Sequence, residues 1–339
     1  MRNMILAVAL IILTSECALA LQTSTTYYSH ILFDNSLMSD QYFYGRAEAT
    51  NTSTITTVNG RLPVENRIFH TPPNALRLQW NSNPNGGWSA LIKRPDIRNL
   101  AAHYEGDTLL LWCYAEHAIA AGDLPLVRLI DSGRGFSVAV KMGDFVKDIP
   151  EGKWINVAIP LRNFKPEALR GFDPARVESV EFIQHATDAV PHALIVDDIK
   201  IDFASVPATG LKTPTNIRAR GYDRHIDISW DATATESLQH FIVYRSSDGK
   251  RYSPIGIQFP GINRYADFLG RSGETAYYKV AAVDRGYRES KPSEVASAST
   301  RALSDDELLT MVQEANFRYY WDGAHPVAGL ALENIPGDD

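Results

Sequence analysis

One strand-like stretch of the chain carries side chains that could bind a sugar. In TLLLWCYAE, Trp112, Tyr114 and Glu116 alternate with Leu111 and Cys113. Successive side chains of a β-strand point to opposite faces, so the first three share one face. A Trp and a Tyr on an outer sheet face offer a platform for a sugar ring, and the carboxylate can bind hydroxyls. The alternative is that this face packs on another module or under a loop.

Trp88 is a further candidate for the same platform. It follows the stretch NPNGG, whose Asn, Pro and Gly residues are typical of a turn. From a loop its indole ring could lie beside the strand that carries Trp112. We therefore predict Trp88 as a substrate-binding residue.

An acidic side chain interrupts an apolar row near the end of this region. In LIVDDIKI, the period of two predicts that Ile195, Asp197 and Ile199 share one face. An unpaired buried charge costs several kcal/mol, so Asp197 in that row needs a cation. The alternative is that the strand ends at Val196 and Asp197 faces solvent.

Calcium is the cation that this chemistry suggests. It accepts carboxylate oxygens as ligands. If the first and last strands of the region pair, Asp34 or Asn35 comes to lie alongside Asp197. The sequence therefore predicts a structural calcium site at Asp34 and Asp197, and no motif in the chain predicts an organic cofactor.

The stretch RYYWDGAHP near the C-terminus gathers aromatic residues, an acid and a histidine. Glycosidases act with two carboxylates that flank the scissile bond, and an apolar wall raises the pKa of a carboxyl group. Asp322 could be one of these acids. The alternative, which we favour because no partner carboxylate is identifiable, is that these side chains shape a sugar subsite or cap a helix. Substrate-binding residues are then Tyr320, Trp321, Asp322 and His325, and the catalytic residues stay unassigned.

The elements that must position these residues are mostly strands. Residues 29–203 contain many short strand-like stretches between turns, a pattern typical of an antiparallel sandwich of the jelly-roll type. Residues 204–214 have the composition of a linker. Residues 215–300 form a second all-β unit, in which Ile226, Ile228 and Trp230 alternate.

The period changes at residue 303. Ser304 and Glu307 have the spacing of a capping box, and Leu308 and Val312 begin an apolar stripe at helical spacing. We predict an amphipathic helix of about four turns. In this chain, the second all-β unit is the neighbour available to cover the apolar stripe.

Composition and targeting signals narrow the function. The net charge is −7 and no long basic run is present, which argues against a nucleic-acid partner. Residues 1–20 have the charge, apolar run and small-residue ending of a secretory signal peptide, so we expect a secreted or periplasmic monomer that leaves the membrane after cleavage. Lipidation at Cys17 is a weaker alternative, because Glu16 stands where a small residue is needed. Cleavage leaves Cys113 without a disulfide partner, so we expect it to be buried as a small hydrophobe.

Residues 215–300 resemble a fibronectin type III domain. The resemblance rests on the Trp that ends an early strand and on the stretches YKVAAVD and SKPSEVASAST. It implies that Tyr278 is a corner tyrosine whose hydroxyl bonds to nearby backbone. Alternation along YYKVAAVD separately predicts that Tyr278, Val280 and Ala282 face inward.

Residues 303–339 resemble the beginning of the glycoamylase-like catalytic domain, a family related to bacterial β-1,2-glucanases with an (α/α)6 barrel. The matching residues are Phe317, Tyr319, Tyr320, Trp321, Asp322, His325, Pro326, Gly329, Leu330 and Asn334 to Asp339. Such a barrel needs many more packed helices than these residues can form. The resemblance implies the N-terminal part of a larger glycan-degrading enzyme, inactive in this chain.

The first module also resembles the N-terminal sandwich of those enzymes and many carbohydrate-binding modules. The stretches ILFDNSL, EGKWINVAIPL and LIVDDIKI carry this resemblance. A polysaccharide or oligosaccharide partner follows from it. The competing hypothesis is a non-catalytic secreted binding or adhesion protein made of two sandwiches.

Overall fold

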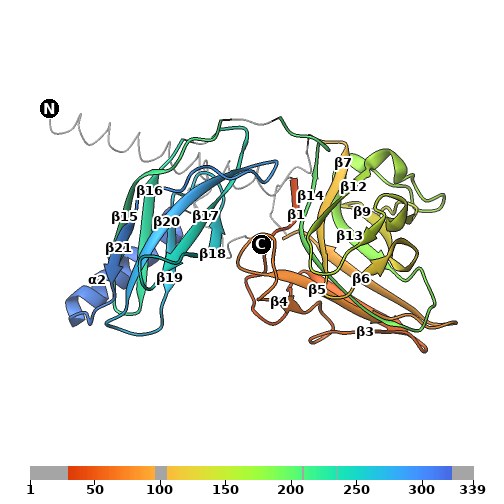
Figure 1. Cartoon of the computed structure of the whole chain (residues 1–339), viewed down its shortest axis with the longest axis horizontal. Coiled ribbons are helices and arrows are strands. Elements are labelled where there is room, and N and C mark those ends of the chain that lie inside the picture. Colours follow the sequence, from red (N-terminus) through yellow and green to blue (C-terminus); the bar gives the residue numbers. More distant parts are fainter. Residues whose placement is uncertain (1–29, 96–104, 208–209, 234, 323–339) are drawn as a thin grey trace. The chain divides into compact units, whose positions relative to one another are not determined.

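The computed structural model describes residues 30–95, 105–207, 210–233 and 235–322 (Figure 1). These residues divide into two compact units. We call the residues up to 205 the N-terminal sandwich and those from 206 the C-terminal unit. The described elements are nearly all strands, followed by a C-terminal α-helix, which confirms the predicted mostly-β fold.

The N-terminal sandwich contains two large antiparallel sheets. The first sheet comprises β1 (Ile31–Phe33), β3 (Thr54–Ile55), β4 (Val64–Glu65), β5 (Ala75–Asn81), β7 (Thr108–Ala115), β12 (Ile155–Pro160) and β14 (Pro191–Asp202). Its strand order is β12-β7-β14-β5-β3, with β1 paired to β14 and β4 paired to β5.

The second sheet comprises β2 (Gly45–Thr50), β6 (Gly87–Lys93), β9 (Leu126–Asp131), β10 (Val140–Lys141) and β13 (Val177–Ile183). Its strand order is β10-β9-β13-β6-β2. A small additional sheet pairs β8 (Ile119–Ala120) with β11 (Asp148–Ile149). Short 3-10 turns complete the unit: η1 (Ala121–Asp123), η2 (Met142–Asp144), η3 (Leu161–Asn163) and η4 (Pro174–Arg176).

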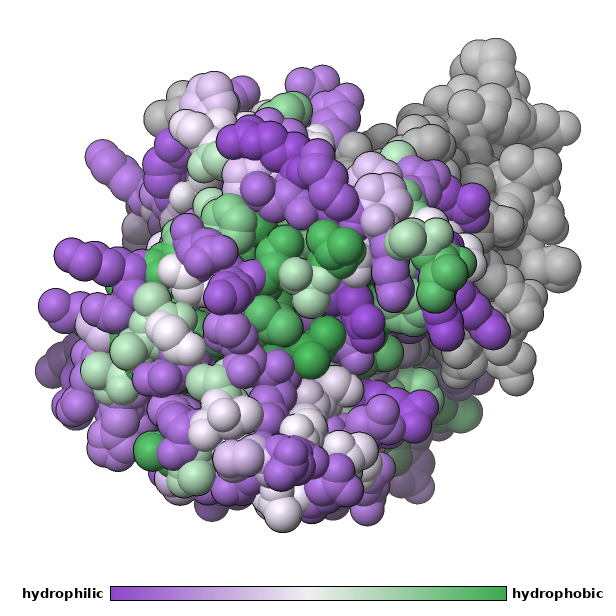
Figure 2. Space-filling model, turned by 90° about the vertical axis from the view of Figure 1, so that its right-hand side faces the viewer, coloured by the Kyte–Doolittle hydropathy of each residue, from purple (hydrophilic) through white to green (hydrophobic). Residues whose placement is uncertain are grey.

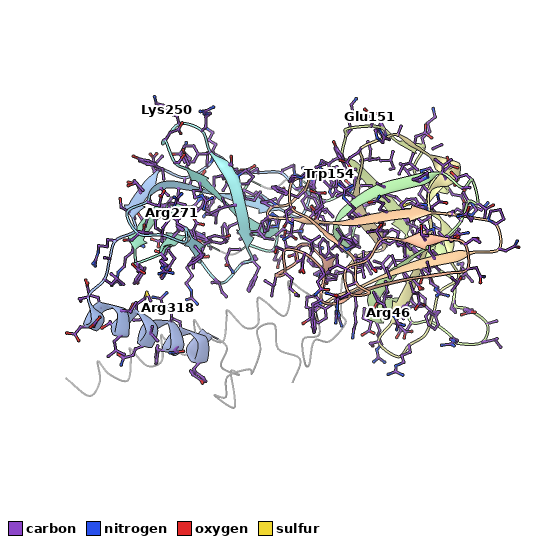
Figure 3. The ribbon with its side chains drawn as sticks, turned by 90° about the horizontal axis from the view of Figure 1, so that it is seen from below. Arg46, Glu151, Trp154, Lys250, Arg271 and Arg318 are labelled. Atoms are coloured by element: carbon purple, nitrogen blue, oxygen red, sulfur yellow. The ribbon has the colours of Figure 1, made fainter. Side chains whose placement is uncertain are left out.

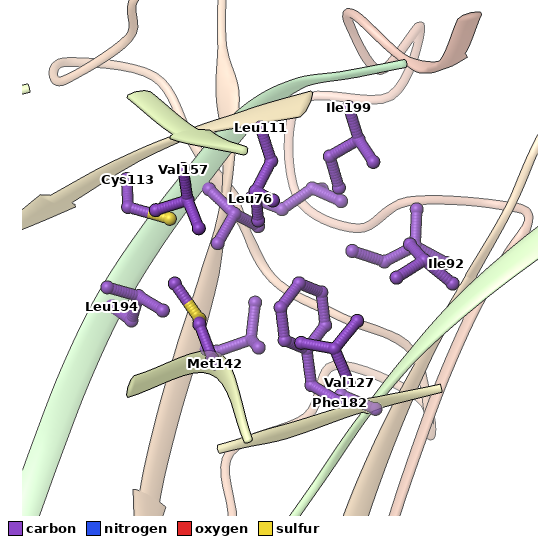
Figure 4. Packing of buried hydrophobic residues seen from close by; sticks show 14 of the residues in the cluster. Leu76, Ile92, Leu111, Cys113, Val127, Met142, Val157, Phe182, Leu194 and Ile199 are labelled. Carbon is purple, nitrogen blue, oxygen red and sulfur yellow. The ribbon is translucent and has the colours of Figure 1, made fainter. Parts of the chain in front are cut away.

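One continuous apolar core lies between the two large sheets (Figure 4). Leu111 and Cys113 face it from the first sheet, and Val127 and Phe182 face it from the second. The period of two therefore buries one row of each strand and leaves the other row on an outer face. Cys113 is fully buried as predicted, and this burial raises the pKa of its thiol.

The C-terminal unit has a core of its own between two further sheets. One sheet has the order β15-β16-β19, with β15 (Thr215–Gly221), β16 (His225–Asp231) and β19 (Arg264–Phe268). The other has the order β18-β17-β20-β21, with β17 (Leu238–Ser246), β18 (Ser253–Gln258), β20 (Thr275–Asp284) and β21 (Ala296–Ser299). The rows predicted to face inward do so: Ile226, Ile228, Trp230, Tyr278, Val280 and Ala282.

The predicted partner of the Tyr278 hydroxyl is wrong. This hydroxyl donates a hydrogen bond to Oδ2 of Asp267, 2.8 Å away, rather than to nearby backbone. Arg245 Nη1 donates to the same carboxylate at 2.9 and 3.0 Å. The buried carboxylate of Asp267 therefore joins β19 to Arg245 on β17 and to Tyr278 on β20.

Helix α2 (Asp305–Asp322) begins with the predicted capping box. The backbone N–H of Glu307 donates to Ser304 Oγ, and that of Ser304 donates to Glu307 Oε2. The expected packing differs, because Leu308 and Val312 are 42% and 44% exposed. Arg318 lies on this helix (Figure 3) and donates to Asp227 Oδ2 at 2.8 Å, and Glu314 accepts a bond from the Tyr222 hydroxyl at 3.5 Å. The polar side of α2 faces the strands.

The start of the predicted linker is bound to the C-terminal unit. Arg288 Nη2 donates to the backbone oxygens of Val206 and Pro207, at 3.0 and 2.8 Å. None of the described helices is long and apolar enough to cross a membrane.

Candidate functional site

The outer face of the first sheet carries the predicted platform residues. Leu111 and Cys113 point into the core, so Trp112 and Tyr114 point outward, as the period of two predicted. Both outward rings are half-buried, and Glu116 is exposed. The outer face of β7 thus presents two aromatic rings and a carboxylate in one row.

Two further rings complete an aromatic cluster at this face. The imidazole of His70 stacks on Trp112, with ring centroids 4.0 Å apart and planes 14° apart. The ring of Trp154 lies 5.7 Å from that of His70 and 5.4 Å from that of Tyr114. We call His70, Trp112, Tyr114 and Trp154 the aromatic cluster.

The sequence contained a signal for Trp154 but none for His70. Ile155 begins β12 and pairs with Cys113, and Val157 and Ile159 point into the core. Trp154 immediately precedes this inward row, so alternation places it outward, next to Tyr114. His70 lies in the connection between β4 and β5, where no periodic pattern predicts its orientation.

Two consecutive buried aspartates hold the segment that carries His70. Nδ1 of His70 lies 2.5 Å from Oδ2 of Asp198, and Thr71 Oγ1 donates to the same oxygen at 2.7 Å. The backbone N–H groups of His70 and Thr71 donate to Oδ2 of Asp197 at 2.8 and 2.9 Å. These bonds fix the imidazole over Trp112, so one face of that indole is covered.

Charged side chains border the aromatic cluster. Arg77 Nη1 donates to Glu116 Oε2 at 2.6 Å, and Arg77 Nε donates to Glu65 Oε2 at 3.1 Å. Burial opposes ionisation of Glu65, but the bonds from Arg77 and from the Arg67 backbone outweigh it and lower the pKa of Glu65. A fixed guanidinium and two carboxylates can exchange hydrogen bonds with sugar hydroxyls.

Trp88 does not belong to this platform, and its prediction is corrected. Strand β6 begins at Gly87, so Trp88 is a strand residue that faces the core together with Ala90 and Ile92. It is 3% exposed, and its Nε1 donates to Ser82 Oγ at 3.0 Å. The apolar row that Trp88 forms with Ala90 and Ile92 at a period of two was the overlooked signal.

The face assigned to Asp197 is also corrected. Leu194 and Val196 face the core, and so do Ile199 and Ile201. Val196 and Ile199 are three positions apart, so on a regular strand they would point to opposite faces. The register with β7 shifts between Asp197 and Lys200, and Asp198 has a φ of 49°. This β-bulge inserts an extra residue, so Asp197 does not share the face of Ile199.

Asp197 is nevertheless buried, which makes the solvent-facing alternative wrong. Burial, followed by the charge of Asp198, raises its pKa well above the ordinary value for an aspartate. Its oxygens accept three backbone N–H bonds, since the Asp198 N–H donates to Oδ1 at 2.8 Å in addition to the two bonds at Oδ2. Backbone donors thus supply partners that the prediction assigned to a cation.

The calcium prediction stays a prediction. Strands β1 and β14 pair as the prediction required, with Phe33 opposite Ile199. Asp34 directly follows Phe33, on the side of the pair where β14 carries Asp197 and Asp198. Oδ1 of Asp34 accepts a bond from the Asn35 N–H at 2.7 Å. Among the described residues, Asp34 and Asp197 do not belong to a group of three ligating side chains whose ligand atoms lie within 4.8 Å.

The outer face of the second sheet is partly apolar too. Figure 2 shows the side that lies to the right in Figure 1, with apolar residues at its centre and hydrophilic ones around them. Register places Leu91, Glu181 and Arg128 in one row. The ring of Phe136 lies 4.7 Å from the guanidinium carbon of Arg128 and 4.8 Å from that of Arg170. Because guanidinium groups already cover this ring, the aromatic cluster is the better candidate for sugar stacking.

The predicted C-terminal site residues are only partly described. Tyr320 lies on α2 and is 63% exposed. The side chains of Trp321 and Asp322, and the whole of His325, lie outside the described residues. Apart from the exposure of Tyr320, the prediction for these four residues lies outside what the structure describes and stays a prediction.

Comparison with known families assigns the N-terminal sandwich. Residues 29–203, more than half of the chain, match the sequence profile of the family described as Carbohydrate binding domain 30. The chain belongs to this family. Its own geometry, an outward aromatic cluster bordered by paired charges, agrees with a saccharide partner.

Two relatives extend the likeness beyond this domain. The chain is 37% identical over 319 residues to an exo β-1,2-glucooligosaccharide sophorohydrolase (non-reducing end) of Parabacteroides distasonis, which covers 94% of this chain. The crystal structure of a β-1,2-glucanase from Parabacteroides distasonis is likewise 37% identical, with a TM-score of 0.80 over 91% of this chain. The chain spans 44% of the length of each.

Proposed function

We propose that this chain is the glycan-binding region of an exported glycan-degrading protein, and that the aromatic cluster is its sugar platform. The observation that carries the proposal is the arrangement of rings and charges on the outer face of the first sheet. Sugar rings present C–H faces that pack on aromatic rings, and their hydroxyls require donors and acceptors at the border. Trp154, Tyr114 and the Arg77–Glu116 pair supply both.

The relatives indicate the class of glycan. The names of both relatives refer to β-1,2-linked glucans or their oligosaccharides, and the sequence similarity extends over more than nine-tenths of this chain. We propose linear β-1,2-linked glucans and their oligosaccharides as the ligands. The N-terminal sandwich then acts as a jelly-roll binding module, and the signal peptide directs the protein to the periplasm or the medium.

The rest of the chain fits the same proposal. The C-terminal unit acts as a fibronectin type III spacer, since its strand succession and separate core are typical of that fold. Helix α2 and the residues after it are proposed to begin a glycoamylase-like catalytic domain. The exposed apolar side chains of α2, among them Leu309 and Phe317, are consistent with a surface that further helices cover.

Affinity electrophoresis of the full chain tests the proposal. Soluble β-1,2-glucan cast into the gel should retard the chain, while an equal concentration of a soluble α-glucan should not. Trp154→Ala should restore at least most of the free mobility, because the sugar then loses one of its rings. Equal mobility of the parent chain in all gels would refute glycan binding, and retardation by the α-glucan alone would refute the proposed ligand class.

A further inference from the structure

Three ligating side chains meet at one end of the N-terminal sandwich, away from the aromatic cluster. They are Asp123, the last residue of η1, Asp188, which precedes β14, and His192, the second residue of β14. One ligand atom of each lies within 4.8 Å of the others. Chain segments more than sixty residues apart therefore bring an imidazole and two carboxylates together.

The fold holds the imidazole of this group in place. His192 pairs with Trp80 across the strands, and the two rings lie 5.5 Å apart at the edge of the core. Nε2 of His192 lies 2.6 Å from Oδ2 of Asp188. The side chain of His192 is 11% exposed and that of Asp188 is 25% exposed.

The charges of the group are not balanced by protein partners alone. The carboxylate of Asp123 makes no hydrogen bond or ion pair with another described residue, yet it lies within 4.8 Å of a second carboxylate. Two ionised acids at this distance repel each other and are stabilised by a cation between them.

We propose that Asp123, Asp188 and His192 form a binding site for a divalent first-row transition-metal ion such as zinc. Calcium takes six to eight oxygen ligands, whereas zinc accepts imidazole nitrogen and carboxylate oxygen and, at sites with three protein ligands, takes water at the fourth position. The ion takes the place of the proton that His192 and Asp188 share. Ligand atoms around tetrahedral zinc are about 3.3 Å apart, so the two partly exposed side chains separate slightly on binding.

Such an ion joins η1 to the start of β14. Because the ion binds a deprotonated imidazole, protons compete with it for the site. Because the ion binds the folded sandwich, it also raises the melting temperature of that unit.

Calorimetric titration of the full chain with zinc chloride at pH 7.5 tests the site. We expect one equivalent to bind, and Asp123→Asn to weaken binding at least about tenfold, since even outer-shell partners of metal ligands contribute that much. Asp123 is chosen because its carboxylate holds no described protein group, so the variant should fold normally. His192→Ala should have the same or a larger effect, and circular dichroism reports whether it remains folded.

Matched controls separate this site from general zinc binding. His117 is 95% exposed on the same unit, and Asp144 is an exposed aspartate in η2. His117→Ala and Asp144→Asn should bind zinc as the parent does. Equal affinity of the parent and of Asp123→Asn would overturn the proposal, as would an absence of zinc binding by the parent.

Discussion

The substitution Asp197→Asn tests how the segment under the aromatic cluster is held. Asp197 accepts three backbone N–H bonds, from His70, Thr71 and Asp198. An asparagine offers one acceptor oxygen, which can keep the two bonds at the Oδ2 position. Its amide group then faces the Asp198 N–H, so one buried donor loses its acceptor.

The expected cost follows from that count. Leaving a buried donor unsatisfied costs about 1–3 kcal/mol. We therefore expect Asp197→Asn to lower the unfolding free energy of the N-terminal sandwich by about 2 kcal/mol at pH 5. The transition of the C-terminal unit should not change, because the two units have separate cores.

The deficit should depend on pH. Burial and the charge of Asp198 raise the pKa of Asp197 in the folded state. A raised pKa of an acid stabilises the fold most below the unfolded value of about 3.9, and this contribution is lost as pH rises through the folded value. The difference between parent and variant should therefore shrink as pH rises.

Urea unfolding at several pH values measures the stability loss and its pH dependence, and calorimetry shows which unit is affected. Asp144→Asn, on an exposed turn of the same unit, serves as the matched control. A variant as stable as the parent at pH 5 would refute the role of the three backbone donors. If chelator lowers the parent's first transition and leaves the variant unaffected, the calcium prediction holds instead of the backbone account.

Three further predictions concern other parts of the chain. Tyr278→Phe should destabilise the C-terminal unit by about 1.5–3 kcal/mol, because its hydroxyl bonds to a buried carboxylate. A calorimetric scan in which the transition of the C-terminal unit is unchanged would contradict this. The bond from Arg301, followed by the Ser304 N–H, lowers the pKa of Glu307 to about 2. The helix cap should therefore persist above pH 4.5 and be lost as pH falls through 2, and Arg301→Ala should move the NMR-measured pKa of Glu307 upward; an unchanged value would refute the pairing. The chain itself should release no sugar from β-1,2-glucan, since hydrolysis requires two positioned carboxylates; reducing-sugar release above that of a boiled sample would contradict this.

Alternation along strands carried most of what could be predicted. It placed Trp112 and Tyr114 outward and the rows of Ile226 and Tyr278 inward, because a strand's period depends on local geometry alone. It failed at Asp197, where a β-bulge adds a residue and reverses the faces beyond it. Such a bulge depends on pairing with a neighbouring strand, which a single stretch of sequence does not reveal.

Contacts between distant segments explain the remaining differences. His70 reaches Trp112 from a connection with no periodic pattern, held there by side chains 127 and 128 positions away. Trp88 was misassigned because the strand begins directly after the turn. The polar side of α2 faces the strands because Arg318 forms an ion pair with Asp227. A hydrophobic pattern does not predict such a pair.

Binding of a β-1,2-linked gluco-oligosaccharide to variants of the two outer faces tests the central claim most directly. Calorimetric titration should give a measurable affinity for the parent chain and for Phe136→Ala, whose ring lies beside Arg128 of the second sheet. Tyr114→Ala and Trp154→Ala on the first sheet should each bind at least about tenfold more weakly, equivalent to ~1.4 kcal/mol. Unchanged binding by both first-sheet variants, with loss of binding in Phe136→Ala, would contradict the claim that the aromatic cluster is the sugar platform.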